Sequence, residues 1–370
     1  MGVGRKLMST DQGFPIIKYT GTSPLNWGKM HGEEFRSGIK ELAMIRRELM
    51  LAKNPSLLPK LDELSKAQWD ASTKYDPALM EEVKGLVAGS GLSNLDLVIL
   101  NNYTDFRDLQ LPEEGCSTVH VQTQNQTLAG QTWDMHNSAK NYLCLIHVPE
   151  TENSPEMLSL SLVGCLALMG INTHNFLIGV NNINTTNAKA GILWPLYVRR
   201  LLRERSVIAA RKLLETAPVT SGHNYIVSDK SQGEHWEVTP SVSERVGHVD
   251  AGKSGYSFHT NHCIGSKITP FEDQSSRSST TQVRWDLLEK HVPHVASLPD
   301  MYSLLTSHDG YPQSLCSHYE SGAQDPSFTC GGGISDLRAG VGKFWRGCPE
   351  HDKNFKKVDY RLEAGHFVLN

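Results

Sequence analysis

Hydrophobic positions in the first hundred residues recur at helical spacing. Residues 39–49 carry a large apolar side chain every three or four positions, as on the buried face of an amphipathic helix. Ser23 followed by Pro24 predicts a helix start, because a serine cap and a proline in the first turn suit a helix N-terminus. Two further helices are predicted over residues 77–91 and 95–102. This part of the chain is therefore predicted to form a helical packing layer.

At Gly115 the helical spacing gives way to alternation of apolar and polar positions. Residues 116–122 alternate, a polar stretch follows, and residues 127–133 alternate again, which predicts a β-hairpin that begins at Cys116. One strong helix opened by Pro195 and a weaker one over residues 283–291 interrupt the later strands. The further strands are predicted at 143–148, 157–162, 176–180, 224–228, 235–238 and 256–260.

Strands that follow one another with few intervening helices favour antiparallel sheets with helices on their outer faces. The predicted fold class is therefore α+β. We expect one integrated domain in which residues 1–115 are mostly helical and residues 116–370 supply the strands. A chain of 370 residues with 39% hydrophobic residues is sufficient for a substantial core.

Charge and hydropathy exclude several classes of partner. The 36 basic and 40 acidic residues give a net charge of -4 and form no run of one sign, so we expect no nucleic-acid partner. No segment approaches the roughly 18 apolar residues of a membrane span, and the first residues lack the apolar stretch of a secretory signal. We therefore expect a cytoplasmic protein without a membrane partner, in which the glycosylation patterns at Asn102, Asn125 and Asn184 carry little weight.

The cysteines are predicted to be free thiols. Seven of them are spread widely along the chain without a C-x-x-C pair, which favours buried small hydrophobic side chains over disulfides.

Cys116 has the local sequence of a nucleophile that could process its own chain. A glycine before it permits the backbone geometry that an attack of the thiol on the Gly115 carbonyl requires. The resulting N-to-S acyl shift and hydrolysis would leave Cys116 as a new N-terminus, whose α-amine, with a pKa of roughly 7.7–8.0, could serve as general base. The alternative is a structural cysteine at the start of a strand.

Three other residues are candidates for the same site. Asp134 ends the second strand of the hairpin, where its carboxylate could orient the new amine, although an aspartate at a strand end is also common in turns. Asn261 follows a predicted strand and could stabilise an oxyanion through its amide. Asn181 could place another amide near the substrate or simply mark a strand-to-turn junction.

Histidines beside Asn261 raise two rival interpretations. His259 could act as the base of a papain-like Cys116, but such a nucleophile normally begins a helix near the mature N-terminus. His259, His262 and Cys263 could bind zinc, but no second group with ligand spacing accompanies them, so no metal is expected. The glycine-rich run 329–333 lacks the lysine and spacing of a phosphate loop and predicts a tight turn or bulge.

Four motifs taken together resemble one family. Gly115-Cys116-Ser117-Thr118, Trp133-Asp134 with the aspartate eighteen residues after the cysteine, Ile178-Gly179-Val180-Asn181 and His259-Thr260-Asn261-His262 occur in the order and spacing of the acyl-coenzyme A:6-aminopenicillanic acid acyltransferase family. This family, peptidase family C45, is a branch of the N-terminal nucleophile hydrolases. The resemblance covers most of the chain and weakens after about residue 290, and residues 329–346 depart from the expected pattern.

The resemblance implies an αββα sandwich of two antiparallel sheets with outer helix layers. It also implies autocatalytic cleavage at Gly115–Cys116 into an α subunit (residues 1–115) and a β subunit (residues 116–370) that stay associated. By the same resemblance Cys116 is the nucleophile, Asp134 orients the new N-terminus, Asn261 stabilises the oxyanion and Asn181 binds substrate.

The expected activity is that of an N-terminal cysteine amide hydrolase or acyltransferase. The substrate class is a small N-acyl or N-aminoacyl amine, for example a β-alanyl amine, attacked through a Cys116 thioester. The alternatives are a penicillin-type N-acyltransferase that uses an acyl-coenzyme A donor, and an unprocessed binding protein of the same fold. No cofactor is expected, with a coenzyme A thioester considered only as an acyl donor, and a homo-oligomer is compatible with the sequence.

Overall fold

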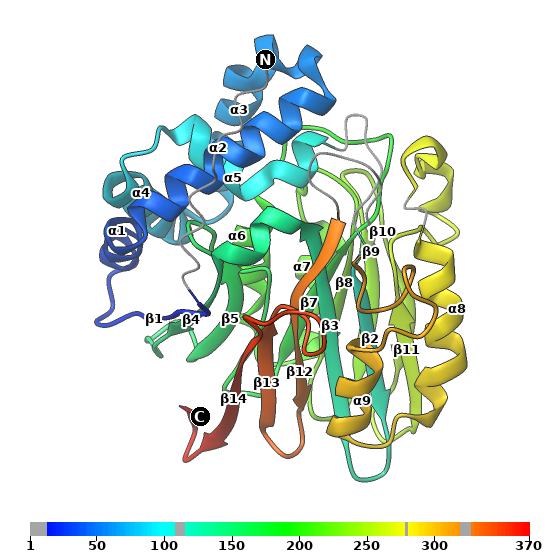
Figure 1. Ribbon diagram of the computed structural model, residues 1–370. Helices are drawn as coiled ribbons and strands as arrows, with labels where there is room; N and C mark the ends of the chain where they lie inside the picture. The colour runs from blue at the N-terminus through cyan, green and yellow to red at the C-terminus, as the bar shows by residue number, and fades with distance from the viewer. Residues whose placement is uncertain (1–12, 108–114, 278–279, 319–326) are drawn as a thin grey trace.

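Two β-sheets lie face to face, with helices on the outer face of each (Figure 1). The computed structural model describes residues 13–107, 115–277, 280–318 and 327–370. Helices α6 and α7 pack on the eight-stranded sheet, and α8 and α9 cover the seven-stranded sheet. The strands are antiparallel to their neighbours except that β1 pairs with β4 in parallel. The predicted αββα sandwich is therefore confirmed.

The strands come almost entirely from the second part of the chain. The eight-stranded sheet has the order β1 (Ile16–Lys18), β4 (Leu143–Val148), β5 (Met157–Leu162), β6 (Met169–Asn172), β7 (Leu177–Asn182), β8 (His223–Ser228), β9 (Gly233–Val238) and β10 (Ser243–Val249). The seven-stranded sheet has the order β11 (Gly255–His259), β2 (Ser117–Gln122), β3 (Thr127–His136), β12 (Ser327–Asp336), β13 (Val341–Arg346), β14 (Lys356–Glu363) and β15 (His366–Leu369).

The helices fall into an N-terminal layer and two outer layers. The N-terminal layer consists of α1 (Pro24–Glu34), α2 (Arg36–Lys53), α3 (Leu61–Tyr75), α4 (Pro77–Ser90) and α5 (Asn94–Arg107). The outer layers consist of α6 (Trp194–Leu201), α7 (Val207–Thr216), α8 (Thr281–His291) and α9 (Leu298–Leu305).

Helices α1 and α4 approach each other closely because both carry small residues on the facing side. A Cβ added to Gly28 would lie 1.9 Å from the carbonyl oxygen of Glu82, and one added to Gly85 would lie 2.2 Å from that of Leu25. Only glycine permits this backbone contact. Helix α1 begins as predicted, with the Ser23 side chain accepting from the backbone N–H of Asn26.

The hairpin predicted at Cys116 is present. Strand β2 pairs with β3 from Ser117 opposite Thr132 to Gln122 opposite Thr127. The strands predicted between residues 143 and 260 all occur within two residues of their expected bounds, while β1, β6, β10 and β12–β15 were not predicted. The glycine run 329–333 lies inside β12, where the register shifts between Thr329 and Gly331, so the bulge was predicted correctly and the tight turn was wrong.

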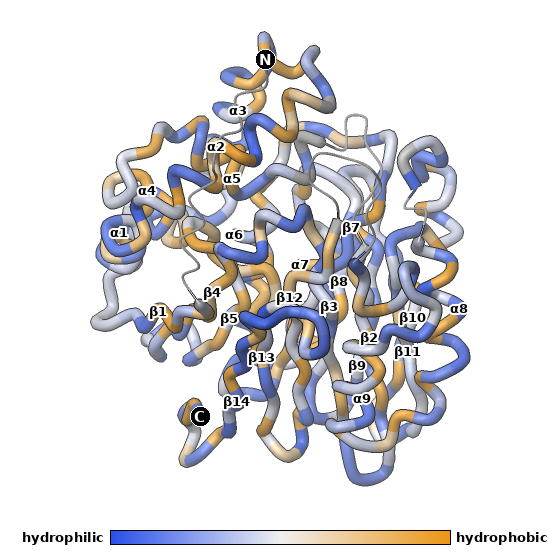
Figure 2. The backbone as a smooth tube through the Cα atoms, in the orientation of Figure 1, coloured by the Kyte–Doolittle hydropathy of each residue, from blue (hydrophilic) through white to orange (hydrophobic). Residues whose placement is uncertain are grey.

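Hydrophobic residues concentrate along the inner strands and the helix faces that pack on them (Figure 2). The larger core joins the eight-stranded sheet to the N-terminal helices, and includes Ile39, Leu42 and Leu86. A second cluster joins the seven-stranded sheet to α8 and α9.

Taken singly, no helix in the described part of the chain is both long and apolar enough to cross a membrane. By length and composition alone, α4 and residues 94–103 could do so only as a pair bent by 115°.

Candidate active site at the start of strand β2

Cys116 lies directly before β2, at the junction of the helical and the strand-rich parts of the chain. Its side chain is 6% exposed, and its Sγ lies 4.0 Å from the backbone oxygen of Asp134. The pairing of β2 with β3 produces this proximity. Ser117 at the start of β2 is opposite Thr132 near the end of β3, so the residue before β2 lies beside the last residues of β3. The predicted neighbourhood of Cys116 and Asp134 is therefore present in the structure.

A small pocket opens beside the thiol. Cys116, Asp134 and Asn182 contribute to its wall together with two aromatic rings, and its volume is about 20 Å³. The complete set of lining residues is Cys116, Trp133, Asp134, Met135, Val180, Asn182, Trp194 and His223. A volume of this size holds about one water molecule.

Arg284, on α8, places a buried cation in this region. Its Nη1 donates to the backbone oxygen of Cys116 at 2.7 Å and to Ser117 Oγ at 3.1 Å, and its Nη2 donates to Asn261 Oδ1 at 2.8 Å. Burial lowers the pKa of Arg284, while the nearby Asp134 and Cys116 oppose that shift. A guanidinium remains charged in proteins, so a fixed positive charge lies beside Cys116.

Asn261 is oriented by this arginine. An arginine only donates hydrogen bonds, so the atom that faces it must be the amide oxygen and the amide nitrogen must point away. That nitrogen donates to the backbone oxygen of Asn182 at 2.8 Å, and the backbone N–H of Asn261 donates to Thr281 Oγ1 at 2.8 Å. One amide proton can therefore bind Asn182 while the other remains a donor of the kind an oxyanion requires.

Gly115 is required by the same arginine. A Cβ built on Gly115 would lie 2.6 Å from Nη2 and 2.8 Å from Cζ of Arg284. These atoms are held by their own hydrogen bonds and cannot move aside freely. The close approach of the guanidinium gives a second reason for glycine here, beside the backbone freedom considered from the sequence.

Asn181 points away from the pocket, which receives its neighbour Asn182 instead. The Asn181 side chain lies between the sheets, where its Oδ1 accepts from Thr118 Oγ1 at 2.8 Å and from Asn224 Nδ2 at 2.7 Å. Successive residues of a strand face opposite sides, so only one of the two asparagines can reach the pocket. The substrate-binding role of Asn181 stays a prediction, and the geometry favours Asn182 for it.

Gly179 allows a link between the two sheets next to these asparagines. The Gln131 side chain accepts from the backbone N–H of Val180 at 2.6 Å, and its amide nitrogen donates to the carbonyl of the same residue at 3.3 Å. A Cβ on Gly179 would lie 2.3 Å from Gln131 Oε1. The link fixes the end of β7, and with it Asn182, relative to β3.

His223 completes the polar part of the wall and was not identified from the sequence. It lies opposite Asn182 in the pairing of β8 with β7. Burial lowers its pKa to about 4, so the imidazole is neutral near pH 7. A neutral imidazole at this place can accept or donate one hydrogen bond to a bound group.

His259 has structural partners on both ring nitrogens. Its Nε2 lies 2.8 Å from Glu237 Oε1 and its Nδ1 lies 2.7 Å from the backbone oxygen of Thr260. The ring is therefore committed to Glu237 rather than to Cys116, which disfavours the papain-like interpretation. His262 is held by Thr281 Oγ1 at 3.0 Å, and burial lowers its pKa to about 4.

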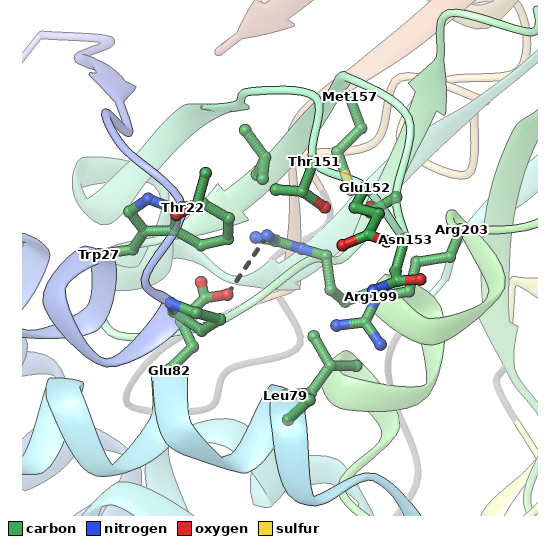
Figure 3. Close-up of a pocket in the computed structure, with 14 residues that line it drawn as sticks. Thr22, Trp27, Leu79, Glu82, Thr151, Glu152, Asn153, Met157, Arg199 and Arg203 are labelled. Carbon is green, nitrogen blue, oxygen red and sulfur yellow. Dashed lines mark hydrogen bonds and ion pairs between the residues drawn. The ribbon is translucent and has the colours of Figure 1, made fainter.

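A larger cavity of about 370 Å³ lies elsewhere, between the N-terminal helices and the eight-stranded sheet (Figure 3). Both of its arginines are already paired, since Arg199 Nη1 lies 3.4 Å from Glu82 Oε2 and Arg203 Nη1 donates to Asp76 Oδ2 at 3.0 Å. Cys116 is not among the residues that line it. Of these two cavities, only the smaller one contains the candidate nucleophile.

Arg284 could have been identified from the sequence by one signal. Thr281, Arg284 and Leu288 share one face of α8 and are all buried, so a charged residue lies on the hydrophobic stripe of its helix. A charge at such a position normally has a specific buried partner. Nothing in the local sequence marks Asn182 or His223 in this way.

Known proteins resemble this chain in sequence and in structure. The family model described as acyl-coenzyme A:6-aminopenicillanic acid acyl-transferase matches residues 121–327. The acyl-coenzyme A:6-aminopenicillanic-acid-acyltransferase 40 kDa form of Emericella nidulans is 24% identical over 277 residues, which are 72% of this chain and 72% of that protein.

Two solved structures are similar at lower identity. A mutant of the conjugated bile acid hydrolase from Clostridium perfringens has a TM-score of 0.42 and 12% identity, covering 69% of this chain and 96% of that one. The Caenorhabditis elegans N-acylethanolamine-hydrolyzing acid amidase ortholog has a TM-score of 0.40 and 13% identity, covering 67% and 100%.

The matched residues make up more than half of the chain, and they contain all of the eight-stranded sheet except β1, together with β3 and β11 of the seven-stranded sheet. The αββα sandwich and the family match define an enzyme of the N-terminal nucleophile hydrolase class. Within that class, the chain belongs to the acyl-coenzyme A:6-aminopenicillanic acid acyl-transferase family.

Proposed function

We propose that the chain cuts itself between Gly115 and Cys116 and then acts as an N-terminal cysteine amide hydrolase or acyltransferase. One observation carries the proposal: the thiol of Cys116 lines one pocket with Asp134, while a buried cation binds its backbone oxygen and orients Asn261. A structural cysteine at a strand start would need none of these neighbours. Family membership supports the reaction class.

In the proposed cleavage, Sγ of Cys116 attacks the carbonyl carbon of Gly115. The C–N bond breaks, the departing nitrogen gains a proton, and a thioester joins the two residues. Water then releases the Gly115 carboxylate and regenerates the thiol. The products are a chain ending at Gly115 and a chain beginning with the free amine of Cys116.

In the proposed turnover, the thiol attacks the carbonyl carbon of a substrate amide while the α-amine of Cys116 accepts the thiol proton. Asn261 donates to the oxyanion, and the protonated amine gives its proton to the departing amine. Water or an acceptor amine then cleaves the thioester. Asp134 is proposed to orient the new N-terminus, because it lines the same pocket as Cys116.

The pocket volume agrees with a precursor role for the uncut chain. About 20 Å³ leaves no room for an acyl group beside Cys116. Cutting the backbone at Gly115 would release one constraint on the wall of the site, so we expect the mature enzyme to accept substrates that the precursor excludes.

The two fragments are proposed to stay associated. Glu82 of α4 and Arg199 of α6 form a buried pair, and Tyr19 Oη donates to the same carboxylate at 3.0 Å. Strand β1 also pairs along β4, so the first fragment contributes to the sheet of the second. We expect the fragments to elute together from a sizing column and to separate only in denaturant.

The substrate is proposed to be a small N-acyl or N-aminoacyl amine, for example a β-alanyl amine. The pocket presents one amide, one neutral imidazole and two tryptophan rings, which suit a short polar group attached to an aromatic or apolar one. A penicillin-type transfer from an acyl-coenzyme A donor is the second candidate, and similarity to the Emericella nidulans protein favours it.

Intact-mass spectrometry of the purified protein tests the cleavage. Wild-type protein is expected to give two masses, one for a fragment that ends at Gly115 and one for a fragment that begins at Cys116. The Cys116→Ala variant is expected to give the single mass of the uncut chain. An uncut wild-type chain would instead support the unprocessed binding protein. A screen of β-alanyl amines, other N-acyl amines and acyl-coenzyme A donors with 6-aminopenicillanic acid then separates the substrate classes.

A further inference from the structure

Four potential metal ligands converge outside the pocket that contains Cys116. His308, Cys316 and His318 lie in the segment after α9, and Cys348 lies in the connection from β13 to β14. Their donor atoms all lie within 4.8 Å of one another. Cys316, His318 and Cys348 are buried, and His308 is partly exposed.

The distances between these atoms match those around a tetrahedral ion. The two Nε2 atoms are 3.2 Å apart, Cys316 Sγ lies 3.7 Å from His318 Nε2, and Cys348 Sγ lies 3.4 Å from His308 Nε2. Zinc with two sulfurs at about 2.3 Å and two nitrogens at about 2.0–2.1 Å holds its donors about 3.3–3.8 Å apart. Two sulfurs and two imidazoles are also a common structural zinc set.

Hydrogen bonds from the backbone hold the Cys348 side chain in place. Its Sγ accepts the backbone N–H groups of Glu350 at 3.4 Å and of His351 at 3.3 Å. Glu350 Oε2 also lies 3.2 Å from Nδ1 of His308, which would fix that ring with Nε2 directed inward. Such contacts around the ligands are typical of metal sites in proteins.

The two segments that carry the four ligands, residues 306–318 and 347–354, contain few hydrophobic residues that could hold them together. The connection from β13 to β14 is strongly hydrophilic in Figure 2, with the sequence Gly-Cys-Pro-Glu-His-Asp-Lys-Asn over residues 347–354. The segment 306–318 has Leu315 as its main core contact. A bound ion would join these two segments in place of a hydrophobic contact.

The same segment supports the strand next to Asp134. The backbone N–H of Ser317 donates to Thr329 Oγ1 at 2.7 Å, and the backbone N–H of Thr329 donates to the Ser317 oxygen at 2.8 Å. Thr329 lies opposite Asp134 in the pairing of β12 with β3. An ion at the four ligands would therefore hold the bulge of β12 without touching the reacting atoms.

We propose that this chain binds one structural Zn²⁺ ion through His308, Cys316, His318 and Cys348. Binding releases the two thiol protons and leaves no open coordination position. From the sequence no metal was expected. Cys348 is separated in the chain from the other three ligands by strands β12 and β13, so the four residues do not form a recognisable motif. The proposal does not depend on the proposed cleavage or on any substrate.

Metal analysis of protein purified without chelators tests the site. Wild-type protein is expected to contain one zinc per chain, and Cys348→Ser is expected to reduce zinc to background. Cys263→Ser is the matched control, because Cys263 is also buried but belongs to the rival histidine group. Loss of zinc in Cys263→Ser and not in Cys348→Ser would overturn the proposal.

A second measurement covers the case in which Cys348→Ser does not fold. Wild-type protein expressed with cobalt in place of zinc should show thiolate-to-cobalt charge transfer and the strong visible bands of a tetrahedral site. A thiol-specific mercurial should release the zinc of the wild-type protein. Metal-free wild-type protein, or peptide mapping that finds Cys316 and Cys348 joined as a disulfide, would show the proposal to be wrong.

Discussion

The guanidinium of Arg284 donates a 2.7 Å hydrogen bond to the backbone oxygen of Cys116, although 168 positions separate the two residues. A second nitrogen of the same group binds Asn261. One buried side chain therefore fixes the backbone at the proposed nucleophile and the amide proposed to bind the oxyanion.

Arg284→Lys should slow self-cleavage and turnover while retaining the positive charge. An ammonium is a compact point charge and cannot reproduce the planar fork that contacts Cys116, Ser117 and Asn261 together. Loss of a charged hydrogen bond costs about 1.5–3 kcal/mol, or roughly a factor of 10–100 in rate. The rate of precursor loss on gels measures it, with Lys290→Met on the exposed face of the same helix as control. Unchanged cleavage would contradict the positioning role.

Gly115→Ala should hinder cleavage through a steric effect on Arg284. The added methyl group would lie 2.6 Å from Nη2, well inside van der Waals contact. Gly255→Ala is the matched control, because its Cβ would meet only Val249 at 3.6 Å. Time courses of intact mass should show slower processing for Gly115→Ala alone. Equal rates in both variants would exclude the contact as a constraint.

Asn261→Asp should separate oxyanion binding from folding. The aspartate has the same shape and can pair with Arg284, but it has no amide proton to donate to Asn182 or to an oxyanion. Removal of an oxyanion donor lowers kcat by about 10²–10³. The expected result is a folded protein with low kcat and a nearly unchanged KM. A variant with wild-type kcat would remove Asn261 from the proposed mechanism.

The helical layer should become less stable in acid because of His31. Burial lowers the pKa of His31 to about 3, with Arg199 adding to the shift, and its Nε2 accepts the backbone N–H of Gly164 at 3.0 Å. The folded pKa lies below the ordinary histidine value of 6.5, so the unfolded chain takes up the proton first as the pH falls. Stability is therefore complete above about pH 6.5 and declines by about 1.4 kcal/mol per pH unit toward the folded pKa.

Urea unfolding of the uncut Cys116→Ala chain at about pH 7 and about pH 5 measures this effect. His120 and His223, whose pKa values burial lowers to about 4, should add decreases of the same sign. Replacing His31 with glutamine should reduce the dependence of the unfolding free energy on pH by the contribution of one titrating histidine. An unchanged dependence would show that His31 does not contribute.

Local patterns in the sequence determined much of the fold and part of the site. The helical spacing of residues 39–49, the cap at Ser23 and the alternation on both sides of residues 123–126 depend on near neighbours in the chain, and each element is present. The hairpin also determines the proximity of Cys116 to Asp134, because the turn between two paired strands fixes which of their residues lie opposite each other. Cys116 and Asp134 could therefore be placed together without coordinates, whereas Asn261 was selected through the family resemblance.

Only the tertiary structure decided which residues from distant segments surround the thiol. Arg284 extends from α8 in the outer layer to the backbone oxygen of Cys116. The alternation of side chains along β7 directs Asn182 rather than Asn181 into the pocket. The four proposed zinc ligands meet only because the segment after α9 folds against the connection from β13 to β14. Such contacts depend on how sheets and helices pack. Packing brings together residues that are far apart in the chain, and no periodic pattern in the sequence marks such pairs.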